Sequence, residues 1–237
     1  MAEQIRISAK TLGEVALEGF CPRCFWLKLR VGHRLPFQTF PGIFSSIDSY
    51  SKRIIHSWFD RYSAPPGWLS GLGNLAGYLP PPHHTKFKII NQEYNILLTG
   101  SPDGVFLRRD HSHLIVDYKT SRFTKNQDRL YPMYQAQLNG YACIGEQCGL
   151  SPVSGLALVY TEPLTDEDSA ASNANHLTGG FALGFSVKVR DVPLDASMLE
   201  PLMARTREIY ELASSPSGRP SCQDCQQLRS LLELAGA

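Results

Sequence analysis

Membrane spans, a secretion signal and a strong net charge are all missing from this chain of 237 residues. No uncharged apolar run approaches the roughly 20 residues that a membrane-spanning helix needs, so we expect no membrane association. The first residues, MAEQIRISAKTL, lack the apolar core of a secretion signal, which predicts an intracellular, cytoplasmic location. A net charge of +1 neither requires nor excludes a polyanionic partner, because nucleic-acid binding needs only a local basic surface.

The chain does contain enough apolar material for one substantial core, since 43% of its residues are hydrophobic and 19% are charged. We therefore expect residues 1–237 to form a single domain without internal repeats. The order of helical and alternating patterns predicts an α/β fold around a mixed sheet. The expected helices lie near 8–20, 45–62, 130–147 and 196–214, and the expected strands near 86–90, 94–99, 105–108, 113–118, 155–161 and 181–189. Pro- and Gly-rich residues at 64–84 and polar residues at 165–180 are expected to form loops.

The helix expected at 45–62 carries an apolar and a polar stripe. Its apolar residues recur every three or four positions and predict the buried face, which is formed by Ile47, Tyr50, Ile54, Trp58 and Tyr62. The polar stripe beside them consists of Asp48, Lys52, His56 and Asp60. This arrangement predicts that His56 lies at the edge of the buried face.

Four of the six cysteines form two pairs of the type CxxC, one in CPRC and one in CQDC, namely Cys21, Cys24, Cys222 and Cys225. In an intracellular chain this spacing favours metal binding over disulfides. Two such pairs can complete a four-sulfur zinc site or hold an iron–sulfur cluster. We therefore expect residues 1–30 and 215–237 to meet at a cysteine-ligated site. The remaining two, Cys143 and Cys148, are interpreted as structural thiols on or just after a helix.

The stretch GSPDGVFLRRDHSHLIVDYKTSR places one Asp after a turn and a second Asp near the end of an apolar strand. If RRDHSH forms the turn of a hairpin, the carboxylates of Asp103 and Asp117 converge. Two converging carboxylates suit Mg²⁺ or Mn²⁺, which prefer oxygen ligands. Lys119 points to the same face as Asp117 because side chains alternate along a strand, so it can orient or deprotonate an attacking water. Taken alone, the same residues favour an exposed strand end with a surface Asp–Lys pair.

The helix expected at 130–147 adds the sequence QLNGY, in which Gln137 and Tyr141 lie one turn apart on one face. The combined pattern of Gly-x-x-Asp, Asp-x-Lys and Gln-x-x-x-Tyr resembles the PD-(D/E)XK nucleases. It is most similar to their RecB-like branch, which includes the RecB and AddB nuclease domains and the CRISPR-associated RecB-like exonucleases. The resemblance covers nearly the whole chain and implies a restriction-endonuclease-like core, a central mixed sheet flanked by helices.

The resemblance also implies a role for each residue of the motifs. Asp103 and Asp117 would bind the catalytic Mg²⁺ or Mn²⁺, with the carbonyl of Tyr118 as a further ligand. Lys119 would serve the nucleophilic water.

Gln137 and Tyr141 would contact the DNA strand or brace the active site. His56 would be the metal ligand that such enzymes take from a helix upstream of the sheet. Asp48, on the same stripe, is the alternative for that position.

The cysteine segments CPRCFWLKL and CQDC are similar to those of the iron–sulfur members of the branch. The commonest arrangement there looks like one cysteine near the N-terminus and three near the C-terminus, whereas this chain has two and two. We expect a 4Fe-4S cluster, with structural Zn²⁺ as the alternative.

The activity implied is metal-dependent hydrolysis of DNA, giving a 5′-phosphate and a 3′-hydroxyl. The resemblance favours an exonuclease acting on single-stranded DNA or free ends, in DNA repair, recombination or CRISPR-type processing, beside a helicase or a CRISPR integrase. The residues expected to contact nucleic acid are Arg122, Lys125, Arg129 and Tyr134. The alternative is a non-catalytic nucleic-acid-binding or scaffold protein on a degenerate nuclease fold.

Overall fold

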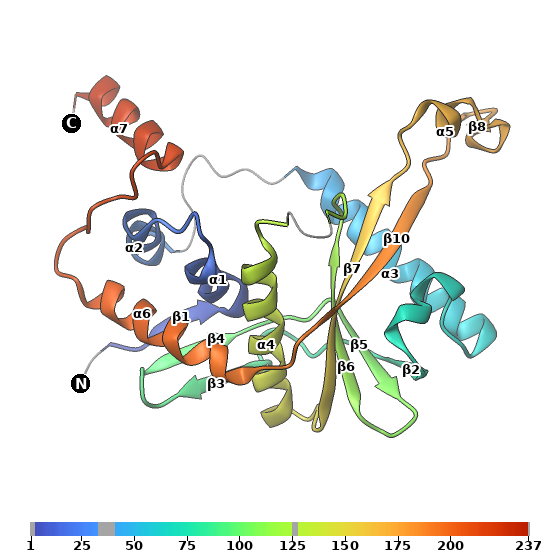
Figure 1. Ribbon diagram of the computed structural model, residues 1–237, viewed down its shortest axis with the longest axis horizontal. Helices are drawn as coiled ribbons and strands as arrows, with labels where there is room; N and C mark the ends of the chain where they lie inside the picture. Colours follow the sequence, from blue (N-terminus) through green and yellow to red (C-terminus); the bar gives the residue numbers. More distant parts are fainter. Residues whose placement is uncertain (1–2, 33–40, 125–127, 237) are drawn as a thin grey trace.

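The computed structural model describes residues 3–32, 41–124 and 128–236, and its centre is a five-stranded mixed sheet (Figure 1). The strand order is β10-β7-β6-β5-β2. β6 and β7 run parallel, and the other neighbouring pairs run antiparallel. The strands are β2 (Leu75–Leu79), β5 (Gly104–Arg108), β6 (His113–Lys119), β7 (Val153–Pro163) and β10 (Phe185–Val192). The expected mixed sheet is therefore present.

A smaller sheet of three strands, in the order β1-β4-β3, joins the N-terminal segment to the middle of the chain. Its strands are β1 (Ile5–Ser8), β3 (Lys88–Asn91) and β4 (Ile96–Thr99), and β1 pairs with β4 in parallel. The guanidinium group of Arg207 fastens this sheet by donating hydrogen bonds to the backbone carbonyls of Glu3, Tyr94 and Asn95. A separate two-stranded hairpin pairs β8 (His176–Leu177) with β9 (Gly180–Phe181).

Helices cover both faces of the central sheet (Figure 1). They are α1 (Ala9–Gly13), α2 (Pro22–Arg30), α3 (Gly42–Tyr62), α4 (Tyr131–Gln147), α5 (Glu167–Ala171), α6 (Leu199–Glu211) and α7 (Gln223–Ala235). Short 3-10 helices occupy Glu14–Ala16, Gly67–Leu72, Asn173–Asn175 and Ala196–Met198. None of the helices in the described ranges is both long and apolar enough to cross a membrane.

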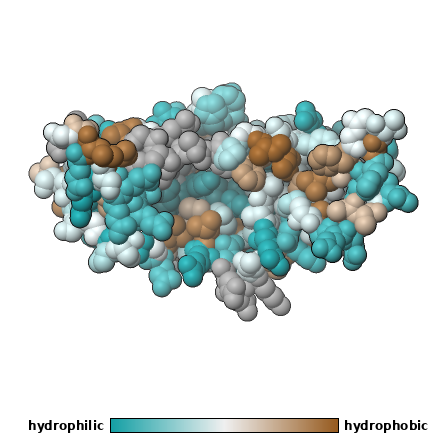
Figure 2. All heavy atoms as spheres, turned by 90° about the horizontal axis from the view of Figure 1, so that it is seen from above, coloured by the Kyte–Doolittle hydropathy of each residue, from teal (hydrophilic) through white to brown (hydrophobic). Residues whose placement is uncertain are grey.

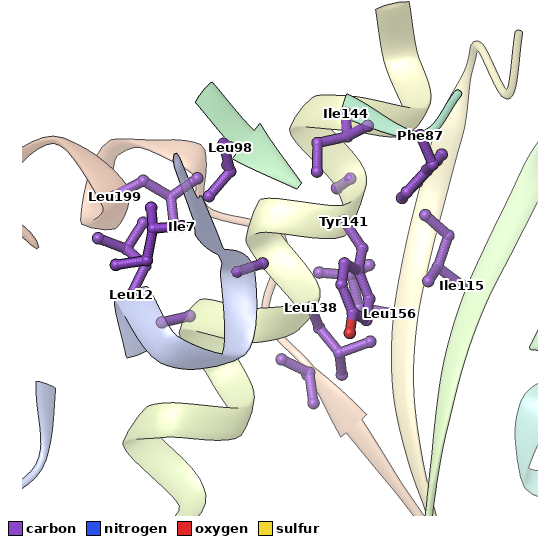
Figure 3. Close-up of a cluster of buried hydrophobic side chains, with 14 of the residues drawn as sticks. Ile7, Leu12, Phe87, Leu98, Ile115, Leu138, Tyr141, Ile144, Leu156 and Leu199 are labelled. Carbon is purple, nitrogen blue, oxygen red and sulfur yellow. The ribbon is translucent and has the colours of Figure 1, made fainter. Parts of the chain in front are cut away.

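The alternation of side chains along β6 divides the core in two. Leu114 and Val116 belong to the cluster beneath α3, whereas Ile115 belongs to the cluster around α4. Figure 3 shows the second cluster, with Ile115 and Tyr141 approaching each other from the sheet and the helix. By the two-residue period, Asp117 and Lys119 continue on the α4 side of the sheet. The strand thus delivers both polar groups to the end of an otherwise apolar face.

The first expected helix differs from the one observed. Ser8 caps a helix as expected, since its hydroxyl oxygen accepts a hydrogen bond from the backbone N–H of Thr11 at 3.0 Å. The helix ends at Gly13, however, and a new helix, α2, begins with Pro22. The stretch 165–180 also differs from the expected loop, because it contains α5 and the β8–β9 hairpin.

The buried face of α3 was predicted wrongly. The residues of that helix that are buried are Ile55 and Phe59, whereas Tyr50, Ile54 and Tyr62 are exposed. The helix is therefore rotated so that the polar stripe flanks the buried residues. The rotation buries Ile55 and Phe59 in the cluster beneath α3, and it brings Lys52 of the polar stripe to the ion pairs described below.

Candidate active site

The β5–β6 hairpin brings the two aspartates of the motif together as expected. Gly104 pairs with Val116 in the antiparallel ladder, so Asp103 and Asp117 follow at the open end of the hairpin. The carboxylate of Asp103 also accepts a hydrogen bond from the backbone N–H of Tyr118 at 3.1 Å. This bond fixes the position of Asp103 beside the last residues of β6.

Asp117 lies at the floor of the site, and its residue is only 3% exposed. One carboxylate oxygen, Oδ1, accepts a hydrogen bond from Nε2 of Gln137 at 3.0 Å. The other, Oδ2, forms a close ion pair with Nζ of Lys119. Nε2 of Gln137 also donates to the hydroxyl of Tyr141 at 2.8 Å. Thus the two residues expected from α4 brace Asp117 from the helix.

Burial dominates the electrostatics of Asp117. Loss of hydration raises the pKa of its carboxyl to about 6, because the nearby ammonium group of Lys119 offsets only part of the cost of burying a charge. The negative charge of Asp103 adds to the increase in pKa. A divalent cation would reverse this balance, since it stabilises the ionised form of both carboxyls.

Lys52 of α3 lies between two further carboxylates. Its Nζ is 2.8 Å from Oδ1 of Asp103 and 2.7 Å from Oδ2 of Asp48. Burial lowers the pKa of Lys52, but the charges and hydrogen bonds of the two aspartates outweigh it and raise the pKa overall. Asp48 therefore belongs to the site, and its link to Asp103 runs through a lysine that had not been predicted as a site residue.

His56 is not brought to the site. Its ring stacks on that of Tyr78, with centroids 4.1 Å apart and planes at 3°. The pKa of His56 is lowered, mainly by burial. Asp48, the alternative to His56, lies one stripe position before Lys52 and two before His56, and its side chain lines the cavity described next.

The site opens into a cavity of about 390 Å³ at the end of the sheet. Figure 2 views the molecule from the end at which β6 finishes and shows a hollow with largely hydrophilic walls. The lining residues include the two motif aspartates, Asp48, Tyr118, Lys119, Gln137 and Tyr141, together with Lys10, Ser101, Thr120 and Tyr134. Lys10 comes from α1 and was missed, since nothing in the sequence around it suggested a link to the motif.

The donor set of this cavity fits a hard divalent cation. Its carboxylates supply oxygen ligands, and the buried carboxylate of Asp117 has the ammonium group of Lys119 as its neighbouring positive charge. The carboxylates do not form a tight three-ligand group, because ammonium groups lie among them. Mg²⁺ needs no more than one or two carboxylates, since it keeps several waters.

The residues expected to contact nucleic acid are placed differently from one another. Nζ of Lys119 lies 3.9 Å from the ring centroid of Tyr134, so that ring borders the active site itself. Arg122 is exposed and pairs with Glu162 at 3.4 Å. Arg129 is exposed. Lys125 lies outside the described residues.

The four paired cysteines gather at a second location, between α2 and α7. The sulfur atoms of Cys21, Cys24, Cys222 and Cys225 all lie within 4.8 Å of one another. Three of the separations are 3.6 Å (Cys21–Cys225), 3.6 Å (Cys24–Cys222) and 3.4 Å (Cys24–Cys225). Cys143 and Cys148 are not part of this group. The structure thus brings together the four cysteines that were expected to bind a metal ion or a cluster.

The thiols of this group influence one another. Burial raises the pKa of the Cys21 thiol, but hydrogen bonds from the backbone of Cys24 and Arg219 outweigh it and lower the pKa to about 7. Burial and neighbouring sulfurs raise the pKa of Cys24 instead. A bound cation is needed to hold several thiolates at such short distances.

The comparisons with known proteins agree with the geometry at the end of β6. A family model for the PD-(D/E)XK nuclease superfamily matches residues 70–229, which include Asp103, Asp117, Lys119 and the whole of α4. The chain therefore belongs to the PD-(D/E)XK nuclease superfamily, whose members are typically metal-dependent nucleases.

No curated protein matches the chain. Among solved structures, the chain is similar to the one described as the crystal structure of SSO0001, with 15% identity over 91% of this chain and 81% of that chain. The TM-score is 0.39, and a likeness of this size carries no structural argument.

Proposed function

We propose that this protein is a Mg²⁺- or Mn²⁺-dependent deoxyribonuclease that uses Asp103, Asp117 and Lys119 to hydrolyse phosphodiester bonds. One observation carries the proposal: a carboxylate that is 3% exposed, paired with a lysine, lines a polar cavity within the matched segment. The sequence there reads Pro102-Asp103 and then Asp117-Tyr118-Lys119, the pattern for which the superfamily is named.

The chain's own groups divide the work of hydrolysis among them. When bound, a divalent cation supplies polarisation of the phosphate and a lowered pKa for a coordinated water. Asp103, Asp117 and the carbonyl of Tyr118 would hold this cation. Lys119 orients the attacking water and balances the negative charge that develops on the phosphate oxygens. Gln137 holds Asp117 in place from α4.

Asp48 replaces His56 in the proposed ligand set. Its carboxylate lines the cavity and shares Lys52 with Asp103, whereas His56 stacks on Tyr78. Asp48 lies outside the matched segment 70–229, yet it contributes to the same cavity. This supports the proposal that residues 1–237 form one nuclease domain.

The substrate that we propose is DNA with single-stranded regions or free ends, and the branch is the RecB-like one. The aromatic ring of Tyr134 beside Lys119 suits stacking of an unpaired base, and the exposed Arg122 and Arg129 suit contacts to phosphates. DNA repair, recombination or CRISPR-type processing, with a helicase or integrase as partner, is the setting that the resemblance suggests.

Cleavage of end-labelled single- and double-stranded DNA, followed over time with Mg²⁺, Mn²⁺ or EDTA, tests the proposal. We expect cleavage with either metal, none in EDTA, and loss of at least about 100-fold in Asp117→Asn and Lys119→Met. Matched controls at two exposed positions of β10 are Asp191→Asn and Lys188→Met, which should cleave as the wild type does. Wild-type rates in both site variants would refute the assignment.

The alternative, a non-catalytic nucleic-acid-binding protein, predicts a different result. It requires DNA binding without cleavage under every metal condition. A filter-binding measurement on the same DNA substrates separates this outcome from a protein that neither binds nor cleaves DNA.

A further inference from the structure

The side of α3 that faces away from the sheet exposes a stripe of large apolar residues. The members of the stripe recur every four positions, are between 40% and 58% exposed, and comprise Tyr50, Ile54, Trp58 and Tyr62. Arg53 and Arg61 each follow a stripe residue by three positions and are exposed, so both border the stripe. A contiguous apolar patch of this kind marks a surface that another macromolecule covers. We call this basic and aromatic side the outer face of α3.

An apolar groove continues the outer face toward the edge of the central sheet. It encloses about 250 Å³ between α3, the 3-10 helix Gly67–Leu72 and the strands β7 and β10. Its apolar lining includes Tyr50, Ile54, Trp68 and Phe185, and none of its described lining residues is charged. The hydroxyls of Ser51 and Thr161, which also line it, donate hydrogen bonds to backbone carbonyls. The groove therefore suits a hydrophobic side chain better than a nucleobase, which needs hydrogen-bonding partners.

Residues 164–184 connect β7 to β10 and form an arm that extends beyond the ends of both strands (Figure 1). The arm contains α5 and the β8–β9 hairpin. Its Phe181 is 81% exposed, and its three leucines, Leu164, Leu177 and Leu183, are exposed as well. Three exposed acidic residues, Asp166, Glu167 and Asp168, lie at the start of α5, and the arm contains no Lys or Arg. The arm is thus an acidic element with exposed apolar side chains.

The arm and the outer face of α3 complement each other. The acidic residues of the arm match Arg53 and Arg61, and the ring of Phe181 matches the apolar groove. Phe181 does not fill the groove of its own chain, since it is exposed and does not line it. Because both surfaces belong to one chain, a second copy related by a two-fold axis satisfies both of them at once.

We propose that this chain forms a two-fold symmetric dimer in which the arm of each copy lies on the outer face of α3 of the other copy. Phe181 enters the groove and acts as the aromatic anchor of the contact. The acidic and basic residues around it favour the encounter and fix the orientation of the two copies. The two contacts are identical, so the assembly closes at two copies.

The dimer supports a helix that its own chain holds weakly. Among the 21 residues of α3, those that are buried are Ile55 and Phe59. The same helix supplies Asp48 to the cavity at the end of β6. Contact with a second copy therefore stabilises a wall of the candidate active site, although the dimer itself does not depend on the nuclease activity proposed above.

Sedimentation equilibrium of the full chain across micromolar concentrations, in buffer without DNA, tests the proposal. We expect the wild type to have twice the mass of one chain, and Phe181→Ser to raise the dissociation constant of the dimer at least about 10-fold. The matched control is Leu234→Ser on α7, which is 87% exposed and lies outside both surfaces; it should dimerise as the wild type does. A monomeric wild type, or a dimer that Phe181→Ser leaves unchanged, overturns the proposal.

Reversal of charge tests which surfaces pair. Arg53→Glu combined with Arg61→Glu, and separately Glu167→Lys combined with Asp168→Lys, should each weaken the dimer at least about 10-fold. An equimolar mixture of these two double variants should recover wild-type affinity, because each arm then meets an outer face of opposite charge. This recovery also shows that both variants fold, and its absence contradicts the proposal.

Hydrogen exchange distinguishes a second copy from other occupants. On dilution from dimer to monomer, the amides of 50–62 and 176–183 should exchange at least about 10-fold faster, with those of β6 unchanged. If these segments are protected only after single-stranded DNA is added, the outer face binds nucleic acid and the dimer proposal is wrong.

Discussion

Replacing Asp117 by Asn should stabilise the metal-free protein while removing its activity. Burial raises the pKa of this carboxyl from 3.8 to about 6. Above pH 6 the carboxyl of Asp117 is ionised in the folded protein. Because its pKa is higher in the folded than in the unfolded chain, this ionisation costs more free energy in the folded chain and destabilises it. The pKa of Asp117 thus differs by about 2 between the folded and unfolded chains. This difference lowers the free energy of unfolding by about 3 kcal/mol, at about 1.4 kcal/mol for each pH unit.

The sign of the pH dependence follows from which state binds the extra proton. Between pH 3.8 and about 6 the folded state binds more protons than the unfolded state. The free energy of unfolding therefore falls as the pH rises through this range. An Asn side chain is uncharged, as the protonated carboxyl is, and it contacts Lys119 in a similar way. The attraction between Lys119 and the ionised carboxyl is already included in the pKa of Asp117, so it is not subtracted a second time. We expect Asp117→Asn to be more stable than the wild type by about 3 kcal/mol at pH 8 and by less than about 1 kcal/mol at pH 4.

Urea unfolding at both pH values, in buffer free of Mg²⁺ and Mn²⁺, measures this difference. Contributions of other groups cancel between variant and wild type at each pH. Asp191→Asn, on the exposed side of β10, is the matched control and should show no such gain. If Asp117→Asn gains no stability at pH 8, or gains as much at pH 4, the reasoning from burial is refuted.

Two further predictions concern the helix beside the site. Lys52→Met removes the ammonium group that bridges the carboxylates of Asp48 and Asp103, so a divalent cation no longer competes with it for them. Isothermal titration should show that Mg²⁺ binds about 10-fold more tightly to this variant. Unchanged affinity would mean that the ammonium group does not compete with the cation. Asp48→Asn should weaken Mg²⁺ binding by about 10-fold, whereas His56→Gln should change it by less than about 2-fold. If His56→Gln weakens Mg²⁺ binding more than Asp48→Asn does in the same titration, His56 is the ligand.

The part of the site that could be predicted from the sequence is the part that depends on local geometry. A hairpin between two strands and the two-residue period of β6 were enough to bring Asp103, Asp117 and Lys119 to one end of the sheet. The turn of α4 that separates Gln137 from Tyr141 was also visible as a spacing.

The rotation of α3 could not be predicted, because it depends on partners far along the chain, such as Phe106, against which Phe59 packs. The aromatic stripe of that helix predicted the buried face. Burial of Ile55 and Phe59 brings the polar stripe inward instead, where Lys52 forms ion pairs with Asp48 and Asp103. The same rotation explains why His56 meets Tyr78 rather than the cavity.

Besides the β8–β9 hairpin, β1 and β2 were missed because their pairing is distant or irregular. β1 has only four residues, and its partner β4 lies about 90 residues further along the chain. β2 lies in the Pro- and Gly-rich stretch and pairs with β5 through an irregularity between Leu75 and Gly77. Neither signal is visible in a short window of sequence.

The separation of the cysteine pairs along the chain has a consequence for synthesis. Cys24 and Cys222 lie 198 residues apart. At about 5 to 20 residues per second, a ribosome therefore produces the first pair about 10 to 40 s before the second. During that interval the first pair lacks its partner, and the four-cysteine group cannot assemble. Its assembly is consequently a late event in the synthesis of each chain, and newly made molecules pass through a stage in which all strands of the central sheet have been made while α7 has not.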